Sequence, residues 1–182
     1  MPVFDKNYKP KDKSEFDTSL FTKFQVGDNK IRILSKAVIG YSWWSDKKKT
    51  VVKTINDIPS NVPQGGRNGY KEFYAFKIYN HTLGTVQLME VTQSSIKRAI
   101  YQLDNSEDWG DIREYDININ RVGEGMETEY TVTPTPKKEL KPEILESVER
   151  VKLDWDKYFD GEPPFIFPEK KDEEVNPKEI PF

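Results

Sequence analysis

The sequence predicts a mainly β fold built around an antiparallel barrel, and three observations predict it. Short runs of β-branched and aromatic residues alternate with polar residues, and clusters of Gly, Asn, Asp and Pro separate these runs. One short amphipathic helix interrupts the series of strands, and it follows a hairpin. The length of 182 residues suits one domain with a buried core.

The N-terminal half supplies two strands and a long loop. Residues 24–34 alternate apolar and polar side chains, with a turn or bulge at residues 27–29, and predict the first strand. Residues 38–44 predict a second strand, which leads through a basic turn into a short extended run at residues 50–55. Residues 56–69 are rich in Gly, Pro and Asn, so they predict a loop.

A hairpin and the short helix follow. Residues 70–79 and 85–91 predict two long strands joined by a tight turn. Thr92 predicts a helix N-cap, and the helix behind it carries an apolar stripe at the spacing i, i+3, i+4 and i+7. The stripe consists of Ile96, Ala99, Ile100 and Leu103.

A second hairpin and a second helix complete the ordered part. Residues 104–113 predict a turn, and residues 115–120 and 128–132 predict the two strands of the hairpin. Pro142 suits the first turn of a helix, and apolar residues recur on one side of the chain that follows. The sequence therefore predicts a C-terminal helix over about 142–159.

Strand, strand, hairpin, helix, hairpin is the element order of an OB-fold, a five-stranded barrel with its helix between strands 3 and 4. We expect residues 23–160 to form one OB-fold domain that includes the C-terminal helix. Residues 1–22 are expected to form a flexible arm. Residues 161–182 are Pro-rich and acidic, so a disordered tail is expected there. Other all-β topologies stay open at this point.

Composition excludes several classes of protein. The chain has no Cys and one His, which excludes disulfides, zinc ribbons and metal sites with two or three His ligands. No apolar run is long enough to span a membrane, and the N-terminus lacks the apolar stretch of a signal peptide. We expect a cytosolic protein without a metal or another cofactor.

Charge is distributed unevenly along the chain. Residues 1–80 carry 15 basic and 8 acidic side chains, a net charge of +7. Residues 81–160 carry 10 basic and 17 acidic side chains, and residues 161–182 carry 3 and 6. The overall net charge of −3 conceals this polarity, a basic front half followed by an acidic back half and tail.

Aromatic and basic side chains are interleaved over residues 32–79, as on surfaces that bind single-stranded nucleic acid. Bases stack on flat rings, each for about 1–3 kcal/mol and without sequence preference, and the phosphates need Lys or Arg. On an OB barrel, strands 2 and 3 and the neighbouring loops form this surface. The candidate DNA-binding residues are Arg32, Lys36, Tyr41, Trp43, Trp44, Lys47, Lys48, Lys49, Lys53, Arg67, Tyr70, Phe73, Lys77 and Tyr79.

Strand alternation assigns some of these residues to faces of the sheet. If Phe76 points into the barrel, then Phe73 and Tyr79 point outward. Trp43 and Trp44 are adjacent, so one is expected in the core and the other on the outer face.

The last four residues, Glu179, Ile180, Pro181 and Phe182, form an acidic and apolar tip. A terminal ring and carboxylate together fit an apolar pocket beside a basic residue. The tip resembles the end of the acidic tails of bacterial and phage single-stranded-DNA-binding proteins. This resemblance implies that residues 161–182 recruit replication and recombination proteins.

A second resemblance lies in residues 109–123 and 128–134. They are similar to a segment of tailed-phage single-stranded-DNA-binding proteins, in which a Trp-Gly-Asp turn precedes a Tyr-Asp-Ile strand, a hairpin and a Tyr-x-Val-x-Pro strand. Residues 27–34 resemble the opening strand of these proteins. The family implies an OB-fold, cooperative or dimeric coverage of single strands, no catalysis, and DNA replication, recombination and repair in the infected host's cytoplasm. Some members hold a Cys/His zinc site, which this chain cannot form.

Enzymatic interpretations are weaker. The acidic residues within 104–111 lack the glycine and the terminal Glu of a calcium loop, and His81 precedes a turn, as surface histidines do. The leading hypothesis is therefore non-sequence-specific binding of single-stranded DNA. The alternative is an OB-fold module that binds a protein or RNA and whose acidic segment mimics nucleic acid. A salt-dependent affinity for oligo-dT, absent for duplex DNA, would separate the two.

Overall fold

The computed structural model of the chain describes residues 20–167. The predictions for residues 1–19 and 168–182, which include most of the arm and the tip at Glu179–Phe182, lie outside the described residues. The elements in chain order are β1 (Gly27–Ile33), β2 (Val38–Ser45), β3 (Lys48–Val52), η1 (Ile55–Asp57), β4 (Lys71–Asn80), β5 (Thr85–Val91), α2 (Ser94–Asp104), η2 (Ile112–Glu114), β6 (Ile117–Val122), η3 (Gly125–Glu127), β7 (Glu129–Pro134), α3 (Pro142–Arg150), β8 (Lys152–Leu153), α4 (Trp155–Phe159) and β9 (Phe165–Ile166).

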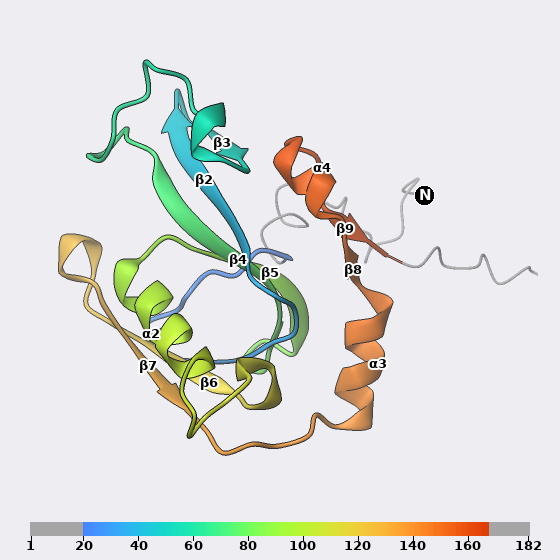
Figure 1. Ribbon diagram of the computed structural model, residues 1–182. Helices are drawn as coiled ribbons and strands as arrows, with labels where there is room; N and C mark the ends of the chain where they lie inside the picture. The colour runs from blue at the N-terminus through green and yellow to red at the C-terminus, as the bar shows by residue number, and fades with distance from the viewer. Residues whose placement is uncertain (1–19, 168–182) are drawn as a thin grey trace, which may run out of the picture.

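The strands β1 to β7 form one antiparallel sheet, which Figure 1 shows curving around α2. The strand order is β3-β2-β4-β1-β6-β7. The seventh strand, β5, also pairs with β4. The long strand β4 is central, because it pairs with β2 near its start, with β1 near its end, and with β5 from Tyr74 onward.

The prediction of a mainly β fold is confirmed, but the five-stranded closed barrel is wrong. Within residues 20–167 the sheet has seven strands, and β5 does not pair with β7, so the sheet stays open. The extra strands are β2 and β3, a hairpin that extends β4 beyond the rest of the sheet. Consequently α2 follows the fifth strand rather than the third, and it packs against β7.

The first hydrophobic core lies between the sheet and α2. Alternate residues of β1, β4, β5 and β6 point into it, as the period of two in their sequences predicts. Ile96 and Ile100 of α2 close it, and Tyr115, before β6, is fully buried in it. Burial raises the pKa of Tyr115 to about 12, with a contribution from Asp104.

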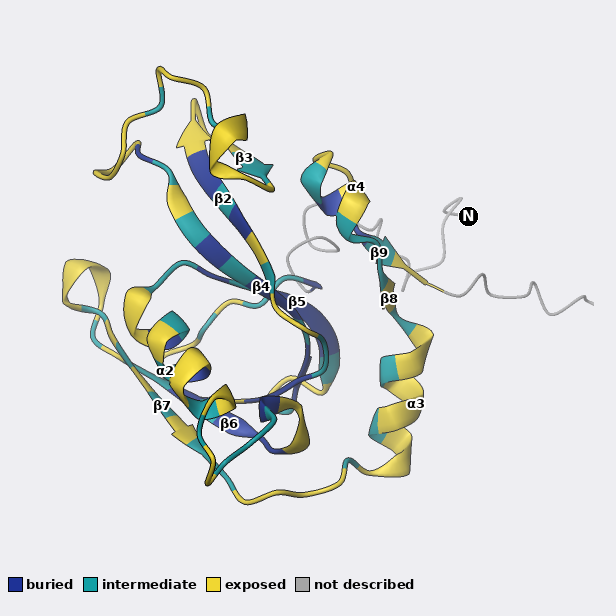
Figure 2. Ribbon diagram, in the orientation of Figure 1, coloured by how far each residue is buried: buried dark blue, intermediate teal, exposed yellow. Residues whose placement is uncertain are grey.

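A second core covers the opposite face of β4 and β5. Phe73, Ala75 and Leu88 point away from α2 and pack against Tyr158 of α4. In Figure 2 the buried residues of β4 and β5 lie between α2 on one side and the C-terminal elements on the other. Both faces of β4 are therefore buried. Phe73 and Tyr79 point away from α2, as alternation predicts, but they are 0% and 9% exposed, so neither presents a ring for stacking.

The C-terminal elements form this cover because the predicted helix over about 142–159 is broken. Val151 is extended, and β8 pairs with β9. The chain then restarts as α4 at the N-cap Asp154, whose side chain accepts hydrogen bonds from the backbone N–H groups of Asp156 and Lys157. The break lets Trp155 and neighbouring rings pack against the sheet.

Two predicted boundaries also differ. The tail was expected from residue 161, but Phe165–Ile166 form β9 and Phe165 packs against the second core. The helix α2 begins at Ser94 with Gln93 as its N-cap, which makes no side-chain hydrogen bond, so Thr92 is not the cap.

Candidate nucleic-acid interface

A cavity of about 900 Å³ lies between the β2–β5 part of the sheet and the C-terminal segment. Its apolar lining includes two tryptophans from β2, Trp43 and Trp44. It also includes three phenylalanines from the two ends of the described chain, Phe21, Phe165 and Phe167. This cavity is the aromatic groove.

The two tryptophans differ in exposure, as strand alternation predicts. The exposed fraction is 8% for Trp43 and 57% for Trp44. The hairpin between β2 and β3 places them, because Asp46 and Lys47 form a two-residue turn with positive φ and set Trp44 opposite Lys49. Trp44 thus presents a largely exposed ring to the groove beside a cation, as stacking with a base requires.

Cations outnumber carboxylates in the lining of the groove. The basic residues are Lys23, Lys49, Arg67 and Lys71, and the acidic residues are Glu90 and Glu162.

Glu90 is already engaged within the groove. It forms an ion pair with Lys49 and accepts a hydrogen bond from the Tyr158 hydroxyl. Burial and the neighbouring Glu90 raise the pKa of Tyr158, so it remains a neutral donor. Within residues 20–167, Lys23, Arg67 and Lys71 form no salt bridge, so these cations can meet an anionic ligand.

Other predicted cations lie near the groove but outside its lining. Lys47 and Lys48 are exposed at the tip of the β2–β3 hairpin. Lys53 forms a 3.1 Å ion pair with Asp156, and its ammonium lies 5.5 Å from the centre of the Phe159 ring. Lys53 therefore contacts α4.

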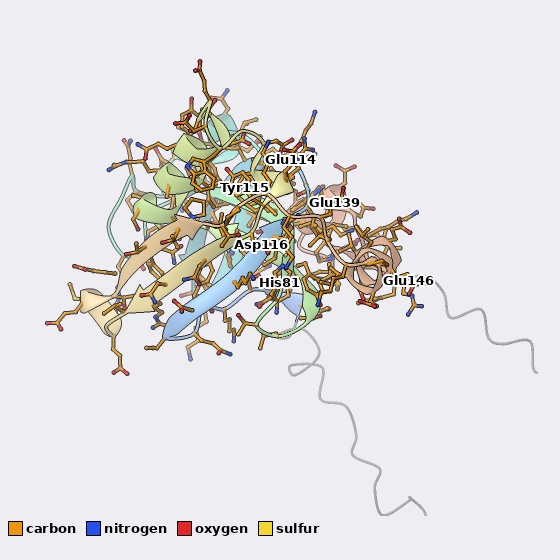
Figure 3. All side chains as sticks on the ribbon, turned by 90° about the horizontal axis from the view of Figure 1, so that it is seen from below. His81, Glu114, Tyr115, Asp116, Glu139 and Glu146 are labelled. Atoms are coloured by element: carbon orange, nitrogen blue, oxygen red, sulfur yellow. The ribbon has the colours of Figure 1, made fainter. Side chains whose placement is uncertain are left out.

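Arg32 does not line the groove, because its guanidinium is buried in a network with Asp116 and the segment after β7. Its Nε lies 2.8 Å from Asp116 Oδ1, and Nη2 donates to the Lys138 carbonyl oxygen at 2.7 Å. His81 Nε2 lies 2.9 Å from the same carboxylate oxygen, and Figure 3 shows His81 beside Asp116. Since Arg32 is 3% exposed, its assignment as a phosphate contact is wrong.

Lys77 is also withdrawn from solvent. Its ammonium donates to the Val148 carbonyl oxygen of α3 at 2.8 Å. Burial, with a smaller repulsion from Lys152, lowers the pKa of Lys77. Lys77 does not line the groove, and its ammonium joins α3 to β4.

Three predicted residues lie away from the aromatic groove. Tyr41 and Tyr70 form an edge-to-face ring pair with their centroids 6.1 Å apart. Lys36 lines a second cavity of about 690 Å³, between α2 and the start of β2 and β4. This second cavity is the helix cleft, and its other lining includes Ile39, Tyr74 and Tyr101.

Three phenylalanines and two lysines are among the groove residues that the sequence interpretation missed. Phe21, Phe165 and Phe167 come from segments whose Pro-rich or polar neighbours predicted an arm and a tail. Lys23 and Lys71 stand among the basic residues of the front half, and Lys71 directly follows the predicted Tyr70. The place of Lys71 at the start of a predicted strand was the one available signal that it belongs to the groove.

No known protein family, curated protein or solved structure matches the chain. No helix among residues 20–167 is long and apolar enough to cross a membrane. That part of the chain also contains no group of three His, Asp or Glu residues able to hold a metal ion. The function is therefore inferred from the groove itself.

Proposed function

We propose that the protein binds single-stranded DNA without sequence preference, in the aromatic groove. The observation that carries this proposal is the exposed ring of Trp44 in a cavity that also holds Lys23, Arg67 and Lys71 without salt-bridge partners among residues 20–167. Flat rings take up bases, and unpaired cations beside them take up phosphates.

The strand pairing supports an OB-fold as the finer description. The strands β5-β4-β1-β6-β7 are neighbours in this order, and α2 lies between β5 and β6 in the chain. This is the OB-fold order with the closing pair missing and with β2 and β3 inserted into the first connection. In that description the groove lies on the outer face of strands 2 and 3 and the first loop, where OB-folds bind oligonucleotides.

Single strands fit the groove better than duplex DNA because stacking on Trp44 requires the free face of an unpaired base. The role proposed is in phage DNA replication, recombination and repair. The tip Glu179–Phe182 is proposed to recruit the partner proteins, on the resemblance of the tail alone.

The test is the binding of fluorescent oligo-dT, measured by anisotropy over a series of salt concentrations, beside a duplex of the same length. Neutralisation of three phosphates, one for each unpaired groove cation, gives a slope of log K against log salt of about −2. We expect oligo-dT to bind with a slope near that value and the duplex to bind much more weakly. Equal binding of both would contradict the preference for single strands, and no binding of oligo-dT would contradict the proposal and favour a protein or RNA ligand.

A further inference from the structure

The helix cleft has the lining of a site for a flat ring. Tyr101 on α2 is 62% exposed, and Ile39 on β2 is 52% exposed, so both present unusually large apolar surfaces to solvent. Tyr74 of β4 lines the same cavity. The volume of about 690 Å³ exceeds what one nucleobase requires.

The charges that line the cleft balance, because Lys36 and Arg113 stand beside two carboxylates, so the cleft has no excess of cations for a phosphate. Asp104 and Asp111 line it, and both are already engaged. Asp104 Oδ1 accepts a hydrogen bond from the Ile112 N–H at 3.1 Å, and Asp111 accepts a bidentate pair of bonds from Arg113. Carboxylates repel phosphate but accept hydrogen bonds from the N–H groups on the edge of a base.

The cleft and the aromatic groove share two strands. On β4, Lys71 lines the groove and Tyr74 lines the cleft, and on β2 the corresponding residues are Ser42 and Ile39. Three residues of strand separate each pair, a rise of about 10 Å. Because the two cavities lie on opposite faces of the sheet, a ligand that fills both must cross an edge of β4.

The edge of β4 is open at this point. β5 pairs with β4 only from Tyr74 onward, so no strand covers Glu72 on that side. Lys97 of α2 lies here instead. Its ammonium donates to the Glu72 carbonyl oxygen at 3.0 Å, lies 3.4 Å from the partly exposed carboxylate of the same residue, and lies 5.3 Å from the centre of the Tyr74 ring. A cation therefore stands at the crossing, where a phosphate between two bases would pass.

We propose that the helix cleft is a second base-binding site for the same DNA strand, with the base stacked on Tyr101 and the linking phosphate beside Lys97. This inference rests on the proposed function, since the strand reaches the cleft from the aromatic groove. It predicts that the affinity for long oligonucleotides depends on side chains of both cavities. The affinity for short oligonucleotides depends on those of the aromatic groove alone.

The experiment compares oligo-dT of about four nucleotides with oligo-dT of about twelve, lengths that bracket the range covered by one OB-fold. The variant Tyr101→Ala removes the ring from an exposed helix position, and Tyr101→Phe keeps it. Leu83→Ala, in the β4–β5 turn, is the matched control, because Leu83 is 51% exposed and lines neither cavity. Circular dichroism checks that each variant is folded.

We expect Tyr101→Ala to weaken binding of the longer oligonucleotide about 5- to 150-fold and to leave the shorter one unchanged. Tyr101→Phe and Leu83→Ala keep the affinity for both lengths. An unchanged affinity of Tyr101→Ala for the longer oligonucleotide, or an equal loss for both lengths, overturns the second site alone. If the unsubstituted protein binds neither length, the proposed function fails and this inference fails with it.

Discussion

Replacing Arg32 by Ala separates a structural role from a DNA-binding role. The side chains of Arg32 and Asp116 are 4% and 5% exposed, and their atoms Nε and Oδ1 are 2.8 Å apart. The guanidinium also donates to the carbonyl oxygen atoms of Lys138, at 2.7 Å, and Arg113, at 3.4 Å. It thereby joins β1 to the segments before β6 and after β7.

The expected loss of stability depends on the contacts that Asp116 keeps when Arg32 is replaced. Removing one partner of a buried ion pair costs about 3–5 kcal/mol, because a buried charge is left without compensation. His81 Nε2 stays 2.9 Å from Asp116 Oδ1, and Lys30 Nζ lies 3.8 Å from Oδ2. These contacts compensate part of the charge, so we expect the lower end, about 3 kcal/mol.

Urea unfolding followed by tryptophan fluorescence measures this loss. With an m-value of about 2 kcal/mol/M, the midpoint falls by about 1.5 M while the slope stays constant. Lys30→Ala is the control, and because Lys30 is half exposed its effect stays within about 0.5 kcal/mol. A loss below about 1 kcal/mol for Arg32→Ala, or a shallower salt slope of DNA binding in the folded variant, would refute the structural assignment.

Three further predictions concern charge. Reversing the charges of Lys23, Arg67 and Lys71 should weaken oligo-dT binding about equally for all sequences and make the salt slope shallower, which anisotropy titrations measure; an unchanged slope would place the phosphates elsewhere. Arg113 holds the pKa of Asp111 at about 2 through its side-chain and backbone hydrogen bonds. Any stability from this pair is therefore present above pH 3.8, and it is lost as the pH falls through about 2. Carboxyl NMR titration should show this pKa return toward 3.8 in Arg113→Ala, and a constant value would refute the assignment. Deleting residues 170–182 should tighten DNA binding at low salt, because a tethered anion competes with DNA, and equal affinities would exclude that competition.

The strands were predictable because their signal is local. A period of two and the turn residues between the runs suffice to place β1, β2 and β4 to β7. Asp154 is a local signal of the same kind, since an Asp before Trp155 is a favourable N-cap. The broken C-terminal helix could therefore have been predicted from it.

The errors concern contacts between segments far apart in the chain. Alternation correctly placed Phe73 and Phe76 on opposite faces of β4, but it could not show that α4 covers the outer face. Arg32 occupied a position that alternation leaves outward, and its partner Asp116 lies 84 residues away. In the candidate site, Trp43 and Trp44 were predictable from the sequence. Neighbouring residues of a strand point to opposite faces, so two adjacent tryptophans place one ring on each face.

The most direct test of the central claim is the affinity of Trp44→Ala for oligo-dT, measured by anisotropy beside Leu83→Ala. Trp44 is 57% exposed, so its removal should leave the free energy of unfolding nearly unchanged. If bases stack on this ring, Trp44→Ala loses about 1–3 kcal/mol of binding free energy, or about 5- to 150-fold in affinity, while Leu83→Ala binds like the unsubstituted protein. A folded Trp44→Ala that binds oligo-dT as tightly as the unsubstituted protein would contradict the assignment of the aromatic groove as the DNA-binding site.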